Sequence, residues 1–276
     1  MFFEIIKAIL YGIVEGITEW LPVSSTGHLI LLEQWFPLNA SEGFMEMFDV
    51  VIQLGAILAV IVLFFHKLNP FAPTKDKKQK AQTWDLWFKV VAAVIPSAVL
   101  GFLLDDWMDE HLYNHYVVAV MLIVYGIAFL WVEKYNQKRK PRIRTTEAIS
   151  YKTALLVGCF QVLAMVPGTS RSGATILGAI ILGLSRTVGS EFSFFLAIPT
   201  MLGASLLKAV KFILDGGTMA GSEWVCLIVA CLVAFVVSLL VIRKLMDYVK
   251  RHSFAVFGIY RIILGAAVLL YFLIAG

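Results

Sequence analysis

Two stretches of the chain carry ionisable and hydroxyl side chains inside otherwise apolar sequence. They comprise Glu15, Glu19, Ser24, Ser25, Thr26, Gly27 and His28 in the first stretch, and Gly168, Thr169, Ser170, Arg171, Ser172 and Gly173 in the second. A charged side chain at membrane depth costs about 2.5–3.5 kcal/mol on insertion scales, so such residues point to a functional site. Side chains of these types bind anions, hold metals and transfer protons.

Both hydroxyl clusters precede an apolar run, which predicts that each one marks the start of a helix with a Ser or Thr as N-cap. Capping accounts for one hydroxyl in each cluster, but not for three. A helix start also presents free N–H groups and the positive end of the helix dipole. Arg171 adds a planar, bidentate cation that suits phosphate oxygens. The predicted polyanion pocket therefore uses Arg171 with the phosphate-binding residues Ser24, Thr26, Gly27, Thr169, Ser170, Ser172 and Gly173. Gly168 and Gly173 are expected to give the backbone its freedom there.

Glu15 and Glu19 lie four positions apart, on one face of a helix. Two carboxylates at this spacing repel each other, so near lipid they need a bound cation, a shared proton or a pairing with Arg171. A Glu–Arg clamp that only holds the two stretches together is the structural alternative, but it requires neither the second carboxylate nor the hydroxyls. Beside a polyanion pocket, the pair favours a divalent metal, with Glu15 and Glu19 as its predicted ligands.

His28 directly follows the first hydroxyl cluster. A lone histidine in an apolar helix is more often a packing residue, but next to Ser25 it is well placed as nucleophile, base or acid. The predicted catalytic residues are thus Glu15, Glu19, Ser25, His28 and Arg171. Gln53 and Gln161 are expected to support the site.

The composition predicts an all-α polytopic membrane protein. Of 276 residues, 60% are hydrophobic and only 15% are charged, against about 25% charged in a soluble domain, and the mean hydropathy is +0.84. The apolar runs are continuous, unlike the alternating strands of a membrane β-barrel. We predict six spans, at about 47–66, 88–104, 116–133, 190–211, 223–244 and 254–275. No cleaved signal peptide is expected, because the N-terminus lacks a basic segment and a small-residue cleavage site.

Regions 4–36 and 153–184 do not fit the spanning pattern. Each breaks at a proline, Pro22 or Pro167, and leaves halves of about 12–15 residues that are too short to cross a bilayer. We therefore predict two re-entrant helical hairpins. Such backbone is tolerated at membrane depth only when it is buried in protein or lines a wet cavity.

The basic residues orient these segments. Connections 67–87, 134–152 and 243–253 are rich in Lys and Arg, whereas 212–222 and the acidic 105–115 contain neither. Since basic connections stay in the cytoplasm, the first hairpin is predicted outside and the second inside. Two similar elements that enter from opposite faces form an inverted repeat with a shared site near the midplane.

A gapless alignment supports the repeat. When Gly12 is placed on Gly158, Ser24 falls on Ser170, Ser25 on Arg171, Thr26 on Ser172 and Gly27 on Gly173. We predict a single integral-membrane domain over 1–276, with repeat 1 at about 1–133, repeat 2 at about 150–276 and a basic cytoplasmic linker at about 134–152.

The run from Glu15 to His28 and the run from Pro167 to Gly173 closely resemble the two signatures of the undecaprenyl-diphosphate phosphatase family, also called the bacitracin-resistance protein family. The similarity covers nearly the whole chain, including 48–55 and 190–194. The resemblance implies hydrolysis of the diphosphate on a C55 polyprenol carrier, which recycles the monophosphate for cell-wall synthesis and confers bacitracin resistance. It also implies dependence on Mg²⁺ or Ca²⁺, the bacterial cytoplasmic (inner) membrane, and an active site open to the outer face.

By the same resemblance, Glu15 and Glu19 belong to an acidic metal or base site. Ser25, Thr26 and His28 form a hydroxyl–imidazole cluster, and Ser170, Arg171 and Ser172 bind the phosphate groups. The nucleophile stays open between Ser25, His28 and water. The expected partners are a polyprenyl diphosphate lipid and bilayer lipid, without nucleic acid, and a homodimer is left open.

Three alternatives compete with this interpretation. Broken helices in an inverted repeat are typical of secondary transporters, so a polyprenyl-phosphate transporter or flippase is the main alternative. The type-2 phosphatidic-acid phosphatases are excluded, because Leu177 stands where that class requires a histidine. A purely structural membrane protein would not need Glu15, Glu19 and Arg171.

Overall fold

The structure is a computed structural model that describes residues 1–112, 114–137 and 139–275. Lys138 of the predicted linker and the side chains of Asp105, Asp106 and Asp109 in the predicted outer segment lie outside the described part. The described helices are α1 (Phe2–Thr18), α2 (Ser25–Trp35), α3 (Glu42–Val51), α4 (Gln53–Leu63), α5 (Phe65–Leu68), α6 (Lys77–Leu112), α7 (His115–Asn136), α8 (Tyr151–Val162), the 3₁₀ helix η1 (Leu163–Met165), α9 (Arg171–Ile181), α10 (Arg186–Leu214), α11 (Gly221–Arg251) and α12 (Ala255–Ala275).

Six helical segments among the described residues are long and apolar enough to cross a membrane, which confirms the predicted all-α polytopic class. They are Gly43–Leu63, Lys77–Leu104, His115–Asn136, Arg186–Leu214, Gly221–Arg251 and Ala255–Ile274. Each overlaps one predicted span. The first is formed by α3 and α4, which meet at Ile52.

The limits of α6 differ from the prediction. This helix has 36 residues, so it takes up part of the predicted connection 67–87 and most of the predicted outer segment 105–115. Its start is fixed by a capping box, in which Asp76 Oδ1 accepts from the Gln79 N–H at 2.7 Å and Gln79 Oε1 accepts from the Asp76 N–H at 3.0 Å. Lys and Gln are good helix formers, so a polar sequence did not mean a loop here.

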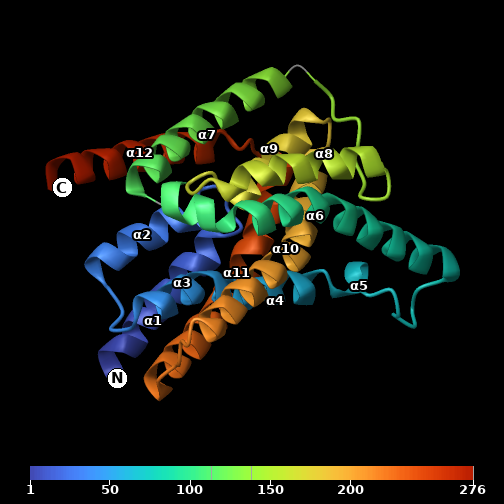
Figure 1. The fold of residues 1–276 in the computed structure, drawn as a ribbon. Helices are drawn as coiled ribbons and strands as arrows, with labels where there is room; N and C mark the ends of the chain where they lie inside the picture. The colour runs from blue at the N-terminus through green and yellow to red at the C-terminus, as the bar shows by residue number, and fades with distance from the viewer. Residues whose placement is uncertain (113, 138, 276) are drawn as a thin grey trace.

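Two units share a helix–break–helix design. Unit 1 comprises α1, the first break (residues 19–24) and α2; unit 2 comprises α8, η1, the second break (residues 166–170) and α9. The first helix of each unit packs on a long helix from the other half of the chain: α1 lies against α11, and α8 lies against α6. The helices α7 and α12 run side by side across one flank of the molecule (Figure 1).

Glycines allow the close helix packing in both units. A Cβ added at Gly12 of α1 would lie 2.6 Å from the Ala230 carbonyl oxygen of α11, and one added at Gly158 of α8 would lie 2.1 Å from the Ala93 carbonyl oxygen of α6. Any larger residue would therefore push the backbones apart. The aligned glycines of the two units thus do the same packing work, and each fixes the helix that leads into its break.

Candidate active site

The two breaks have the same unusual backbone. Ser24 and Ser170 have φ values of 72° and 71°, and no other non-glycine residue in the described part of the chain has a positive φ. Each caps the following helix, since Ser24 Oγ accepts from the Gly27 N–H at 3.4 Å and Ser170 Oγ accepts from the Gly173 N–H at 3.1 Å. The predicted N-caps are confirmed. Strain of this kind is concentrated at functional sites.

Glycine contributes less to the backbone freedom of the two breaks than predicted. Gly168 does have a positive φ of 88°, but Gly173 lies inside α9 with ordinary helical backbone. The prediction that Gly173 supplies backbone freedom is wrong, because Ser170 takes the left-handed conformation itself. A Cβ at Gly173 would instead crowd the Ser170 side chain at 3.2 Å.

Glu19 joins the two units. It follows the last residue of α1 and is only 5% exposed. Its Oε2 accepts a hydrogen bond from Ser25 Oγ at 2.8 Å, and its Oε1 pairs with Arg171 Nη2 at 2.8 Å. The carboxylate therefore contacts a hydroxyl from unit 1 and a cation from unit 2. A carboxylate, a hydroxyl and a guanidinium thus lie within one hydrogen-bonded cluster. Such a cluster is chemically suited to activate a nucleophile next to an anion.

Arg171 keeps unused donor capacity in this arrangement. Its Nη1 donates to the Ser193 carbonyl at 2.9 Å, and its guanidinium lies over the Trp20 ring at 5.6 Å. The Nε–H is buried and has no partner among the described residues. A buried guanidinium edge without an acceptor is suited to a ligand that brings oxygens with it.

Glu15 differs from Glu19 in its hydrogen bonding. It is fully buried, and neither carboxylate oxygen has a hydrogen-bond partner in the described part of the chain. Burial of a carboxylate without a partner is costly, so this group calls for a cation or a proton. Asp49 of α3 also has a buried oxygen without a described partner.

These donors fit a metal only in part. The described residues contain no group of three or more His, Cys, Asp or Glu side chains that could hold an ion. Mg²⁺, however, is usually bound by one or two carboxylates and completes its shell with water and substrate phosphates. Of the two predicted ligands, Glu15 has free oxygens, whereas both oxygens of Glu19 are already engaged.

The imidazole of His28 has partners other than Ser25. Its Nδ1 lies 2.7 Å from the Ser24 carbonyl, which can only accept, so Nδ1 carries the hydrogen. Its Nε2 therefore accepts from the Tyr260 hydroxyl at 2.6 Å. The two rings are stacked, with an interplanar angle of 3°. In this geometry Glu19, and not His28, is placed to take the Ser25 proton.

The other predicted residues lie in different settings. Ser172 donates to the Glu19 carbonyl at 2.9 Å, which links the breaks through their backbones. Thr169 is fully buried and its hydroxyl has no described partner. Thr26 and Gln53 are half-buried. Gln161 belongs to a separate cluster, where its Nε2 donates to Ser97 at 2.7 Å and to Thr200 at 3.1 Å.

The sequence analysis missed three residues at this site: Ser193, Tyr260 and Arg261. Ser193 accepts from Arg171 and shares a 2.6 Å hydrogen bond with Thr175. Arg261 is fully buried in the last span. Like Arg171, Arg261 is a charge inside an apolar run, so the same sequence signal points to it.

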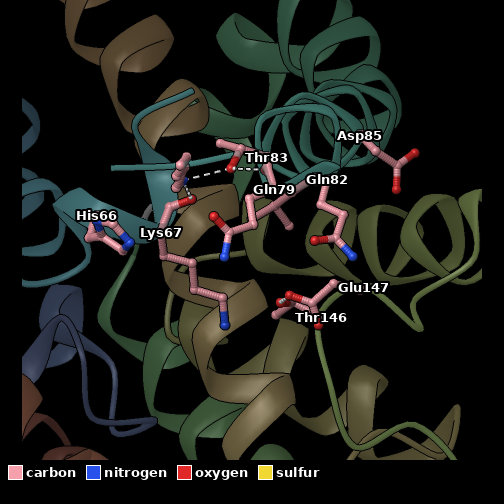
Figure 2. A pocket seen from close by; sticks show the side chains of 10 residues that line it. His66, Lys67, Gln79, Gln82, Thr83, Asp85, Thr146 and Glu147 are labelled. Carbon is pink, nitrogen blue, oxygen red and sulfur yellow. Dashed lines mark hydrogen bonds between the residues drawn. The ribbon is translucent and has the colours of Figure 1, made fainter. Parts of the chain in front are cut away.

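A cavity of about 370 Å³ lies elsewhere, between α5, the start of α6 and the segment around Glu147 (Figure 2). Its cations are already partnered: Lys67 pairs with Glu191 at 2.5 Å, and Lys75 Nζ donates to Thr83 at 2.7 Å. Burial lowers the pKa of Lys75. Among the described residues that line this cavity, Lys67 and Lys75 are therefore less available to a diphosphate than the unpartnered Arg171 Nε–H.

The fold and site define a polytopic membrane protein with a buried acid–hydroxyl–arginine centre assembled from two similar units. The chain matches the family model described as Bacitracin resistance protein BacA over residues 8–267, and it belongs to that family. It is 58% identical over 272 residues to an undecaprenyl-diphosphatase of Streptococcus equi subsp. equi, covering 98% of this chain and 97% of that protein. It is 59% identical over 268 residues to one of Streptococcus thermophilus, covering 97% and 93%. An undecaprenyl-diphosphatase of Limosilactobacillus fermentum is 57% identical over 269 residues, covering 98% of both chains.

Proposed function

We propose that this protein hydrolyses undecaprenyl diphosphate to undecaprenyl phosphate and inorganic phosphate, and thereby recycles the lipid carrier for cell-wall synthesis and confers bacitracin resistance. The family and the similar undecaprenyl-diphosphatases support this activity. The observation that carries it is the double contact of Glu19, which accepts from Ser25 and pairs with Arg171. Phosphoryl transfer needs a positioned hydroxyl, a proton acceptor and a cation for the equatorial oxygens, and these contacts bring all three together.

In the proposed reaction, the diphosphate enters between the two breaks. Arg171 and the N–H groups at the starts of α2 and α9 stabilise the negative charge on the terminal phosphoryl oxygens. Ser25 Oγ forms the bond to the terminal phosphorus and its proton passes to Glu19, while the bridging P–O bond breaks and the lipid monophosphate leaves. Water then cleaves the phosphoserine. The alternative is direct attack by water on the same phosphorus.

A trapping experiment separates these routes. A phosphoenzyme that forms in the wild type but not in Ser25→Ala supports the serine route. A phosphoenzyme that survives in Ser25→Ala excludes serine as the attacking group.

Glu15 is the residue that would hold Mg²⁺ or Ca²⁺, since its two oxygens are buried and have no described partner. When bound, the ion supplies positive charge against the phosphate oxygens. The other named residues act through their own groups: Arg171 orients the phosphoryl group, and Glu19 holds the Ser25 proton.

We further propose that units 1 and 2 are re-entrant hairpins of an inverted repeat in the bacterial inner membrane, with the site open to the outer face. The distribution of basic connections and the matching Ser24 and Ser170 backbones support this arrangement. The polyprenyl tail would lie against lipid between helices. A homodimer stays a prediction.

The deciding assay is release of inorganic phosphate from C55 polyprenyl diphosphate by the purified protein in detergent, with and without a chelator. We expect release that the chelator suppresses. A flippase, the alternative from the sequence, would bind the same lipid but release no phosphate, since detergent offers no membrane to cross. Absence of release with added Mg²⁺ and Ca²⁺ would contradict the proposed function.

A further inference from the structure

The buried guanidinium of Arg261, on α12, contacts three backbone carbonyls from three separate segments. Its Nη1 donates to the Pro22 carbonyl at 3.2 Å, and its Nη2 donates to the Gly168 carbonyl at 2.7 Å. A longer contact of 3.5 Å joins Nη2 to the Met121 carbonyl of α7. The residue is 0% exposed. One side chain thus reaches both breaks from outside both units.

The two carbonyls in the breaks occupy equivalent positions. In the register that places Ser24 on Ser170, Pro22 falls on Gly168. Each carbonyl belongs to the residue two positions before the strained, capping serine. The two amino groups of one planar guanidinium therefore hold the same point of the backbone in unit 1 and in unit 2. Arg261 lies where the two copies meet.

The hydrogen bonds of Arg261 are to carbonyls, and no carboxylate pairs with it in the described part of the chain. The aromatic ring of Tyr125 lies 5.6 Å from the guanidinium, which adds a cation–π contact. A Cβ added at Gly173 would lie 3.3 Å from Nη1, so the charge also sits beside the start of α9. A stabilising ion pair would need a carboxylate next to Arg261, and would not need backbone carbonyls from both breaks.

We propose that Arg261 is a positioning residue for the phosphatase reaction. Its guanidinium locks the two breaks at one separation, and that separation sets Ser25 and Glu19 of the first unit against Arg171 of the second. Among the described residues, Arg261 makes no hydrogen bond to these three side chains, and it acts on them through the backbone. This role rests on the proposed function.

Lysine is the informative substitution. An ammonium retains the charge and most of the length, but it lacks the rigid fork that spans two carbonyls at once. Arg261→Lys should therefore leave one break loosely held. A displacement of about 1 Å between reacting groups can lower turnover about 10²-fold. Because Arg261 does not touch the substrate, KM should stay within about threefold while kcat falls.

Arg186→Lys is the matched control. Arg186 is a half-buried arginine that also makes a two-pronged contact, from Nε and Nη2 to the two oxygens of Glu133, at 3.0 and 2.5 Å. It lies outside both breaks. The control should lower the unfolding temperature and leave kcat near that of the wild type.

The experiment combines two readouts on purified protein in detergent. The first is kcat and KM for phosphate release from C55 polyprenyl diphosphate by wild type, Arg261→Lys and Arg186→Lys. The second does not depend on turnover: spin labels on Trp35→Cys and Ile181→Cys, with the three native cysteines replaced by alanine, report the distance between α2 and α9. Both label positions are exposed, at 63% and 38%. Arg261→Lys should broaden or shift the distance distribution, and Arg186→Lys should not.

A lower kcat with a conserved KM and a broadened distance supports the proposal. An unchanged kcat, or a rise in KM alone, overturns it. If Arg261→Lys does not fold, Arg261→Ala with added guanidinium decides, because recovery of kcat supports the clamp and lack of recovery in a folded sample overturns it. If the wild type releases no phosphate, the proposed function fails, while the distance measurement still tests the clamp.

Discussion

The first and second breaks have the same backbone and different chemistry. Each has a positive-φ serine that caps the next helix, and each follows a helix whose glycine packs directly on a neighbouring backbone. The position after the serine holds Ser25 in one and Arg171 in the other. The backbone is thus retained in both copies, while the side chains have divided the work. Unit 1 holds the acids Glu15 and Glu19, and unit 2 holds the cation Arg171.

The helices that lead into the breaks, α1 and α8, also have different side chains at an aligned position. Glu15 of α1 has no hydrogen-bond partner in the described part of the chain, whereas Gln161, at the aligned position of α8, is satisfied by Ser97 and Thr200. A buried acid without a partner calls for a cation or a proton. We therefore expect a cation or a proton at Glu15 of unit 1 and neither at Gln161 of unit 2.

The largest effect should come from removing the cation of unit 2. Arg171→Gln should lower kcat/KM for phosphate release about 10³-fold, in the range that arginines contribute to phosphoryl transfer. Unfolding temperature and detergent gel filtration serve as controls for the fold. A kcat/KM within about threefold of the wild type would show that unit 2 is not the anion-binding half.

The next largest effect is expected when the residue types at the aligned positions 15 and 161 are exchanged. Glu15→Gln should lower kcat at least about 10²-fold, as loss of groups near a metal does, and should remove the response to added Mg²⁺. The reciprocal change, Gln161→Glu, should lower the unfolding temperature, because a carboxylate cannot donate to Ser97 and Thr200. Titration of kcat against Mg²⁺ measures the first effect, and thermal unfolding in detergent measures the second. An undiminished Mg²⁺ response in Glu15→Gln would contradict a cation site in unit 1.

A smaller effect distinguishes two groups within unit 1. Since Glu19 accepts the Ser25 proton and His28 faces Tyr260, Glu19→Gln should cost at least the roughly 10²-fold that a general base contributes, and His28→Gln less. Tyr260→Phe should resemble His28→Gln. Single-turnover rates for the three variants provide the measurement. The reverse order would assign the proton transfer to His28.

The smallest effect concerns the shared backbone. Ser24→Ala and Ser170→Ala should each lower the free energy of unfolding by about 1 kcal/mol through the lost cap. Ser24→Gly and Ser170→Gly should cost less, because glycine adopts a positive φ without strain. Denaturant unfolding in detergent checks this order in both units. If glycine costs as much as alanine in only one unit, the two breaks are not equivalent.

The sequence predicted what depends on local composition. Hydropathy located all six spans, and the polar residues in regions 4–36 and 153–184 located the cluster around Glu19 and Arg171. The prediction failed at the start of α6, where a polar segment was interpreted as a connection between helices. The capping box at Asp76 starts a helix there.

Contacts between distant segments could not be predicted in this way. The partners of Gln161 come from α6 and α10, and the hydroxyl that His28 contacts comes from α12. The positive φ of Ser170 also has no local signal, because the flanking glycines are the residues that usually take it. Of the three site residues that were not predicted, only Arg261 has a local sequence signal, because it is a charge in an apolar span.

The shared contacts of Glu19 predict that Ser25 of unit 1 and Arg171 of unit 2 act in one chemical step. A double-mutant cycle on kcat/KM for phosphate release, with Ser25→Ala, Arg171→Gln and the double variant, tests it directly. Residues that act as a unit lose little more together than alone. We predict that kcat/KM of the double variant is at most about threefold below that of the slower single variant. Losses that multiply, as for independent sites, would contradict a single composite centre.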